Sequence, residues 1–257
     1  MIVRYLLAAL VAGLFSGVFM TLAQEVGTVP IILKAETYEG GAAPMVHPSE
    51  DGATEQNSSQ SLGPAIVKFA MSLNPVSPAY ADNGADDGDG GIMFGMSRFS
   101  GTLLANLVAS AGFALVLAGF SLVSGRPVTV ANGVLWGIAG WLAIHMLPSL
   151  GLPPGPPGFP NADVVSRKIW WTATVFLSVG GIYLLALVRG LVAKIGGLLL
   201  LIAPHVYGAP KPDDIISSLP AYLGAEFAVA ALGTTLFFWM VLGLALGFTN
   251  EKIARSA

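Results

Sequence analysis

Long apolar runs, separated by short polar or proline-rich stretches, make up most of the 257-residue chain. A helix needs about 20 mainly apolar residues to cross roughly 30 Å of hydrocarbon. Five runs meet this requirement, at residues 5–23, 101–123, 128–147, 170–188 and 221–248. A sixth run, residues 195–206, would rise only about 18 Å as a helix. The pattern predicts an all-α, polytopic transmembrane helical bundle with five firm segments and one short or re-entrant segment.

The first run resembles a secretory signal, but we expect it to be retained. Its uninterrupted apolar stretch exceeds the usual signal-peptide core of roughly 7 to 15 residues. It also carries Gly13 and Gly17, whose four-residue spacing suits close packing against another helix.

The distribution of charge predicts an orientation. With six crossings and a cytoplasmic amino terminus, the cytoplasmic pieces are residues 1–4, 124–127, 189–194 and 249–257, and they hold half of the 12 basic residues. This is the positive-inside pattern. In the five-crossing alternative, the short segment merges with its predecessor or folds back, and the carboxyl terminus moves outside. Merging would bury Arg189 and Lys194 in hydrocarbon, at about 2.5 to 3.5 kcal/mol each. We therefore prefer six crossings.

Composition and motifs remove several classes of function. Only 11% of the residues are charged and the net charge is -3, which argues for a lipid bilayer and against nucleic acid as a partner. The chain has no cysteine, so thiolate metal sites, disulfides and iron–sulfur clusters are excluded. No phosphate loop, HExxH or GxSxG pattern occurs, and we therefore expect no enzymatic activity.

One insertion interrupts an otherwise single membrane domain of residues 1–257. Residues 40–91 are polar and acidic, and they end in the run DNGADDGDGG. Such a composition predicts a largely disordered, extracytoplasmic segment. The spacing of its aspartates does not match a calcium-binding EF-hand loop, so a solvated acidic linker is the favoured interpretation.

Four polar side chains are predicted to converge near the outer face. His145 and His205 each end an apolar segment on that side, Glu226 begins the last segment there, and Asn106 has a similar depth in the second. Imidazole, carboxylate and amide groups suit a divalent first-row metal, although a proton relay uses the same groups. The structural alternative for His145 is a histidine that bonds the last carbonyls of its helix, and for Glu226 a carboxylate in a first helical turn.

Two further carboxylates, Glu36 and Glu39, follow the first segment. On a helix their three-residue spacing places them on one face. They are candidate metal ligands, and a solvated helix end is the commoner explanation for such a pair.

Several stretches of the chain resemble the CbtA family of bacteria, the predicted cobalt-transporter subunits. They comprise residues 29–39 (VPIILKAETYE), 104–106 (LAN), 112–115 (GFAL), 145–148 (HMLP) with 150–154 (LGLPP), and 204–205 (PH) with 208–210 (GAP). The likeness covers nearly all of the chain except the acidic insertion. Gly155 stands where an acidic residue is expected after the two prolines.

The resemblance implies a membrane subunit with about five spans, associated with cobalamin synthesis and paired with a small single-span partner whose tail is rich in histidine. It also implies that His145, His205, Glu36 and Glu39 match the family's pattern. We therefore expect a subunit of a divalent-metal uptake transporter, for cobalt or alternatively nickel. The metal is cargo, and no firmly bound cofactor is expected. The alternative is a non-transporting membrane scaffold that recruits a metal-handling partner.

Overall fold

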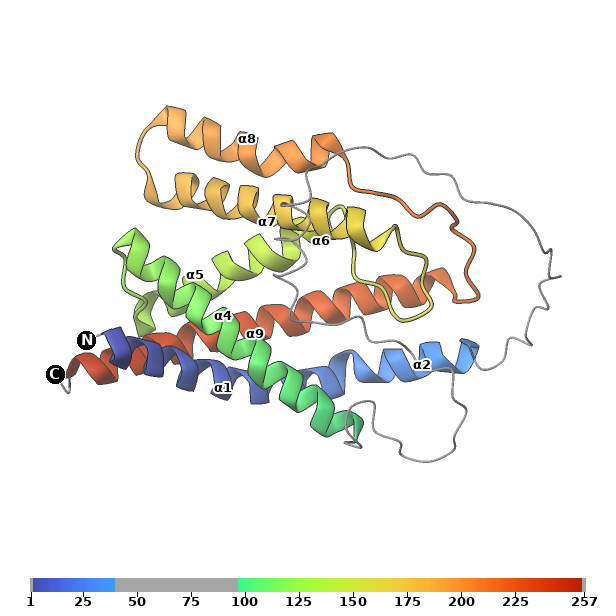
Figure 1. The fold of residues 1–257 in the computed structure, drawn as a ribbon, viewed down its shortest axis with the longest axis horizontal. Helices are drawn as coiled ribbons and strands as arrows, with labels where there is room; N and C mark the ends of the chain where they lie inside the picture. Colours follow the sequence, from blue (N-terminus) through green and yellow to red (C-terminus); the bar gives the residue numbers. More distant parts are fainter. Residues whose placement is uncertain (1, 40–96, 256–257) are drawn as a thin grey trace, which may run out of the picture. The chain divides into compact units, whose positions relative to one another are not determined.

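The computed structural model describes residues 2–39 and 97–255, and in these residues every regular element is a helix (Figure 1). The long helices are α1 (Ile2–Gly27), α4 (Arg98–Ser124), α7 (Val164–Leu187) and α9 (Ala221–Arg255). The shorter elements are α2 (Val29–Glu39), α5 (Val130–Trp141), the π-helical segment η1 (Leu142–Met146), α6 (Leu147–Ser149) and α8 (Leu191–Tyr207). The predicted acidic insertion lies outside the described residues.

Five helices are long and apolar enough to cross a membrane, which confirms the predicted fold class. They are Val3–Gly27, Arg98–Ser124, Val130–Ser149, Val164–Leu187 and Ala221–Ile253. The third of these is α5 continued through η1 and α6. The short sixth segment is α8, whose 17 residues rise about 25 Å. The start of α1 and the end of α9 lie at the same end of the described helices (Figure 1), as six crossings would require.

Helix α9 packs along both α5 and α1, and α1 packs along α4. Glycines make these contacts close. A methyl group on Gly137 would overlap the carbonyl of Trp239, and Gly133 and Gly243 lie backbone to backbone. On α1, a methyl group on Gly13 would come within 2.7 Å of the Ala111 backbone. Small residues of this kind let helices associate in lipid, where there is no hydrophobic force between them.

Helices α7 and α8 form a hairpin that turns at Gly190, which has a φ of 111°. Gly181 and Gly197 meet where the two helices cross. The hairpin joins the other helices mainly through η1 and α6, which pack against α7.

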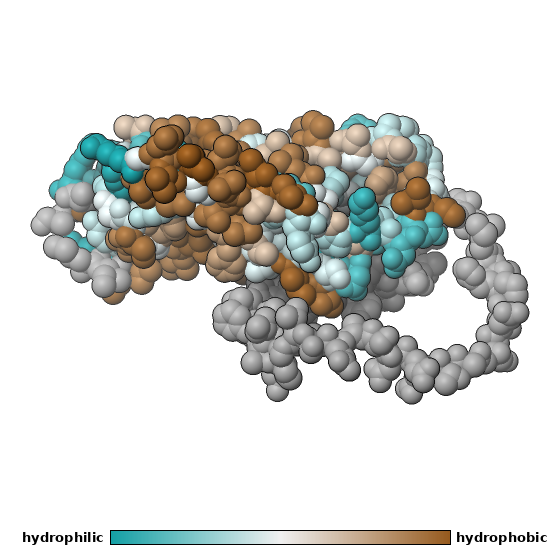
Figure 2. Space-filling model, turned by 90° about the horizontal axis from the view of Figure 1, so that it is seen from above, coloured by the Kyte–Doolittle hydropathy of each residue, from teal (hydrophilic) through white to brown (hydrophobic). Residues whose placement is uncertain are grey.

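The surface over the hairpin is apolar in its middle and hydrophilic towards both ends (Figure 2). On the helices, Phe176 is 70% exposed and Leu199 is 62% exposed. An apolar band between two polar ends is the surface that a bilayer requires.

The close approach of α5 and α9 gives a first prediction. We expect Gly137→Ala to lower the stability of the protein by about 1–3 kcal/mol, because the added methyl group forces the two backbones apart. Gly119→Ala is the matched control, since a methyl group there meets nothing within 4 Å. Thermal unfolding in detergent measures both variants, and equal midpoints would contradict the assigned role of the contact.

Candidate functional site

The helix that carries His145 widens where the histidine lies. Leu147 donates its backbone N–H to the carbonyl of Leu142, a five-residue step that defines the π-helical segment η1. Pro148 follows at once, and it can neither donate a backbone hydrogen bond nor fit against an undistorted preceding turn. The wide turn accommodates this break. Such π-helical turns occur frequently at functional sites.

His145 lies among aromatic rings in the helical core. Its ring centroid is 6.1 Å from that of Phe113 on α4 and 6.2 Å from that of Trp239 on α9, both in edge-on geometry. The Nε2 atom of His145 is buried and has no hydrogen-bond partner within the described part of the chain. In the tautomer that carries its hydrogen on Nδ1, this nitrogen has a lone pair that is open to a ligand.

His205 occupies a comparable setting on α8. Trp170 of α7 donates its indole N–H to the carbonyl of Pro204 at 3.2 Å and packs edge-on to the His205 ring at 5.9 Å. The Nε2 atom of His205 is also buried without a partner among the residues described. His205, Trp170, Gly151 and Lys211 contribute to the lining of a pocket of about 240 Å³.

Glu226 is exposed near the start of α9 and faces a lysine. The pKa of Lys34 on α2 is raised above its usual value, first by a hydrogen bond with Tyr222 and then by attraction to charged groups that include Glu226. The Lys34 ammonium lies 4.9 Å from the centre of the Tyr222 ring. The Glu226 carboxylate therefore has a neighbouring positive charge.

Glu36 has a cationic partner as well. Arg98, at the start of α4, donates to both carboxylate oxygens of Glu36, at 2.9 and 3.4 Å. This ion pair ties α2 to α4 across 62 residues of sequence. Glu39 is the last residue of α2, and its side chain lies outside the described part of the structure.

Asn106 joins α4 to α1 through its amide nitrogen. The nitrogen donates to Thr21 Oγ1 at 3.0 Å and to Gln24 Oε1 at 2.6 Å, so both of its hydrogens are used. Thr21 in turn donates to the carbonyl of Gly17. Side-chain hydrogen bonds of this kind hold membrane helices together, and they leave only the Oδ1 atom of Asn106 for another ligand.

The structure does not bring all the candidates together. In the residues described, no group of three or more His, Asp and Glu side chains could hold one metal ion. His145 lies against Trp239, which follows Glu226 by 13 residues, or about 20 Å along α9. His145 and Glu226 thus differ in depth, and the metal role of the six residues stays a prediction.

Comparison with known proteins gives the family. The model of one family, described as "Probable cobalt transporter subunit (CbtA)", matches residues 2–251. The chain belongs to this family. No curated protein and no solved structure matches it. The family description suggests a cobalt transporter subunit, which implies partners, and the five helices able to cross a membrane support a multi-pass membrane protein. The resemblance noted in the sequence is thereby confirmed.

The role of Asn106 in this CbtA protein can be tested directly. We expect Asn106→Leu to lower the stability by about 0.6–2 kcal/mol, because Thr21 and Gln24 lose their shared donor. Val108→Leu is the control, because Val108 lies on the same helix and is 65% exposed. Thermal unfolding of the two variants in detergent makes the comparison, and an unchanged Asn106→Leu midpoint would exclude a structural role for this network.

Proposed function

We propose that this chain takes up divalent cobalt across the bacterial inner membrane, with His145 and His205 as ligands along the route. Nickel is the alternative cargo. The observation that supports this proposal is the pair of buried imidazole nitrogens that lack partners in the described part of the chain. Neutral imidazole is the commonest protein ligand for such metals.

The surroundings of the two histidines suit a passing ion better than a resident one. Phe113, Trp239 and Trp170 fix the orientation of the imidazole rings but supply no negative charge. Lys211 shares the pocket beside His205 and opposes the arrival of a cation. A transport site has to bind strongly enough to admit its ion and weakly enough to release it. Because the histidines have few neighbouring ligands and little negative charge around them, they would bind the ion weakly enough to release it.

The carboxylates and the amide of the candidate set act at an earlier stage in this proposal. Glu36, Glu39 and Glu226 attract the cation at the outer face, and Asn106 offers its Oδ1 atom. Arg98 forms an ion pair with Glu36, and Lys34 is a positive charge near Glu226, so an incoming ion has to compete with them. This competition keeps the outer carboxylates from trapping the ion.

A second subunit completes the coordination in this proposal. The family description as a subunit supports a partner. The small single-span protein with a histidine-rich tail, implied by the resemblance, would supply the additional ligands.

In this proposal the amino terminus lies in the cytoplasm, because six of the 12 basic residues follow the positive-inside rule with that orientation.

The alternative is a non-transporting scaffold that recruits a metal-handling partner. It is favoured by one observation, the absence of a three-residue metal cluster from the residues described.

Substitution of the histidines tests the ligand assignment. We expect His145→Ala and His205→Ala each to reduce cobalt uptake about tenfold or more, because each removes a lone pair that the ion needs. The measurement is dye-reported cobalt entry into vesicles that contain this chain and its partner. His47→Ala is the matched control, since it removes the third of the three histidines, which lies in the acidic insertion. Full uptake by the double variant would remove histidine ligation from the mechanism, and no uptake by the wild-type complex would favour the scaffold.

The same vesicles give a pH prediction. Protonated imidazole cannot coordinate a metal, so binding by histidine weakens as protons compete with the ion. Cobalt uptake should therefore fall as the external pH is lowered. The remaining uptake of the double histidine variant should lose this dependence, and an identical profile in that variant would assign the effect to other groups.

A further inference from the structure

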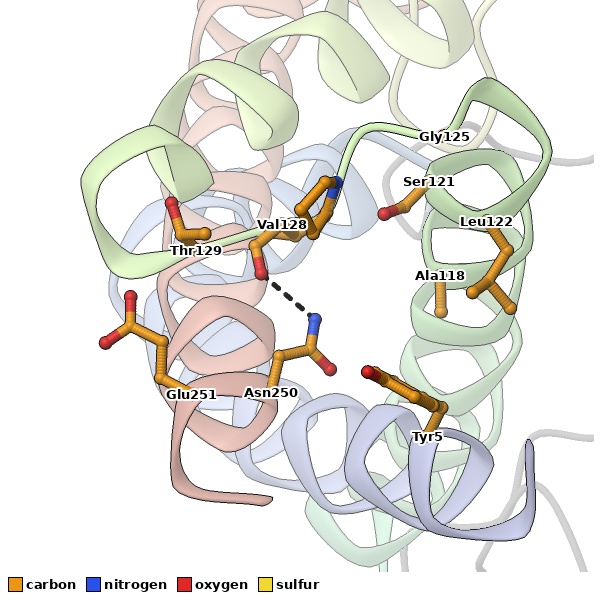
Figure 3. A pocket seen from close by; sticks show the side chains of 10 residues that line it. Tyr5, Ala118, Ser121, Leu122, Gly125, Val128, Thr129, Asn250 and Glu251 are labelled. Carbon is orange, nitrogen blue, oxygen red and sulfur yellow. Dashed lines mark hydrogen bonds between the residues drawn. The ribbon is translucent and has the colours of Figure 1, made fainter. Parts of the chain in front are cut away.

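A second pocket lies at the end of the bundle that carries both chain termini, away from the proposed metal ligands. It has a volume of about 360 Å³ and is bordered by α1, α4, α9 and the loop between α4 and α5 (Figure 3). Val128, which is fully buried, separates it from the apolar core that contains Leu242 and Leu246. The pocket therefore does not continue towards His145.

Three side-chain oxygens from three helices meet in this pocket. Tyr5 of α1 and Asn250 of α9 direct their oxygens towards each other, and the Ser121 hydroxyl of α4 points into the same space (Figure 3). One N–H of the Asn250 amide and the Ser121 hydroxyl hydrogen are already used. The Asn250 amide nitrogen donates to the Val128 carbonyl at 3.1 Å, and the Ser121 hydroxyl donates to the Arg126 carbonyl at 2.7 Å. The Oδ1 atom of Asn250 and the oxygens of Ser121 and Tyr5 remain as acceptors, and the Tyr5 hydroxyl and the second N–H of the Asn250 amide remain as donors.

The pocket offers little to a metal ion. Its one carboxylate, on Glu251, accepts the Val130 backbone N–H at 2.8 Å and lies 3.6 Å from Arg255. In Figure 3 this side chain points away from Tyr5 and Asn250. A divalent ion would lose water here without gaining a free negative ligand. A primary ammonium group instead presents three N–H donors, which match the three oxygens.

The position of the pocket indicates which kind of molecule contains that ammonium group. The surrounding helices are apolar outside, with Leu122 and Val123 of α4 exposed beside the pocket at 56% and 89%. This surface suits an acyl chain. Arg4 and Arg126 adjoin lining residues in the sequence, and basic residues at a membrane surface attract anionic phosphate groups. We propose that the pocket binds the ammonium headgroup of an aminophospholipid from the leaflet at this end of the protein.

Lipid retention tests the proposal independently of metal transport. The full-length protein is purified in detergent with equal amounts of phosphatidylethanolamine and phosphatidylcholine of identical acyl chains, and bound lipid is counted by native mass spectrometry. We expect about a tenfold preference for phosphatidylethanolamine, because the quaternary ammonium of phosphatidylcholine has no N–H to donate.

Two variants locate the site. Tyr5→Phe removes one oxygen, and Leu122→Trp fills the pocket from its exposed side; each should reduce the preference about threefold or more. Tyr183→Phe on α7 is the matched control and should keep the full preference. Equal retention of the two lipids would overturn the proposal, as would an unchanged preference in both pocket variants. Displacement of the lipid by equimolar cobalt or free ethanolamine would also overturn it, in favour of an ion or a soluble amine.

Discussion

The described structure depends on the close contact between α9 and α5. Lipid tails are as apolar as the helix surfaces, so helices in a bilayer associate through packing and hydrogen bonds. Gly133 and Gly137 allow the backbone of α5 to touch that of α9, and Trp239 and Leu242 fill the space beside the contact. Because α9 also packs on α1, this one helix sets the positions of α1 and α5. The residues that it carries, from Glu226 to Asn250, are thereby fixed along the whole depth of the protein.

Polar groups are distributed unevenly over this framework. The carboxylates of Glu36 and Glu226 and the amide of Asn106 all have neighbours that offset their charge or use their donors. The histidines differ, since His145 and His205 keep a buried nitrogen without a partner in the part of the chain described. A bilayer penalises ionisable groups, so an ionisable residue inside a membrane protein is a functional candidate by default.

The sequence predicted the helical fold well, because segment length and apolar content determine which helices can cross a bilayer. It also placed His145 and His205 towards the ends of their helices. It missed the partners of the polar groups, since Arg98 is 62 residues from Glu36 and no periodicity links them. It missed the depth difference between His145 and Glu226, because helix tilt and the course of a chain after a break do not follow from residue counts. Pro148 signalled a break, but a kink and a π-helical turn look the same in a sequence.

Because of the π-helical turn, the number of residues in η1 affects the direction of the following chain as much as the identity of those residues does. A backbone that closes a hydrogen bond over five residues holds one residue more than an ordinary turn, and each residue of a helix accounts for about 100° of rotation. Everything beyond Met146 therefore faces a direction that an unbroken helix would not give it, including Gly151, which lies against Trp170. A deletion of one residue other than His145 within this segment would leave every histidine and every long helix in the sequence, yet it would turn the end of the third crossing away from the hairpin. Insertions and deletions, and not only substitutions, can thus change the direction in which the residues after η1 face.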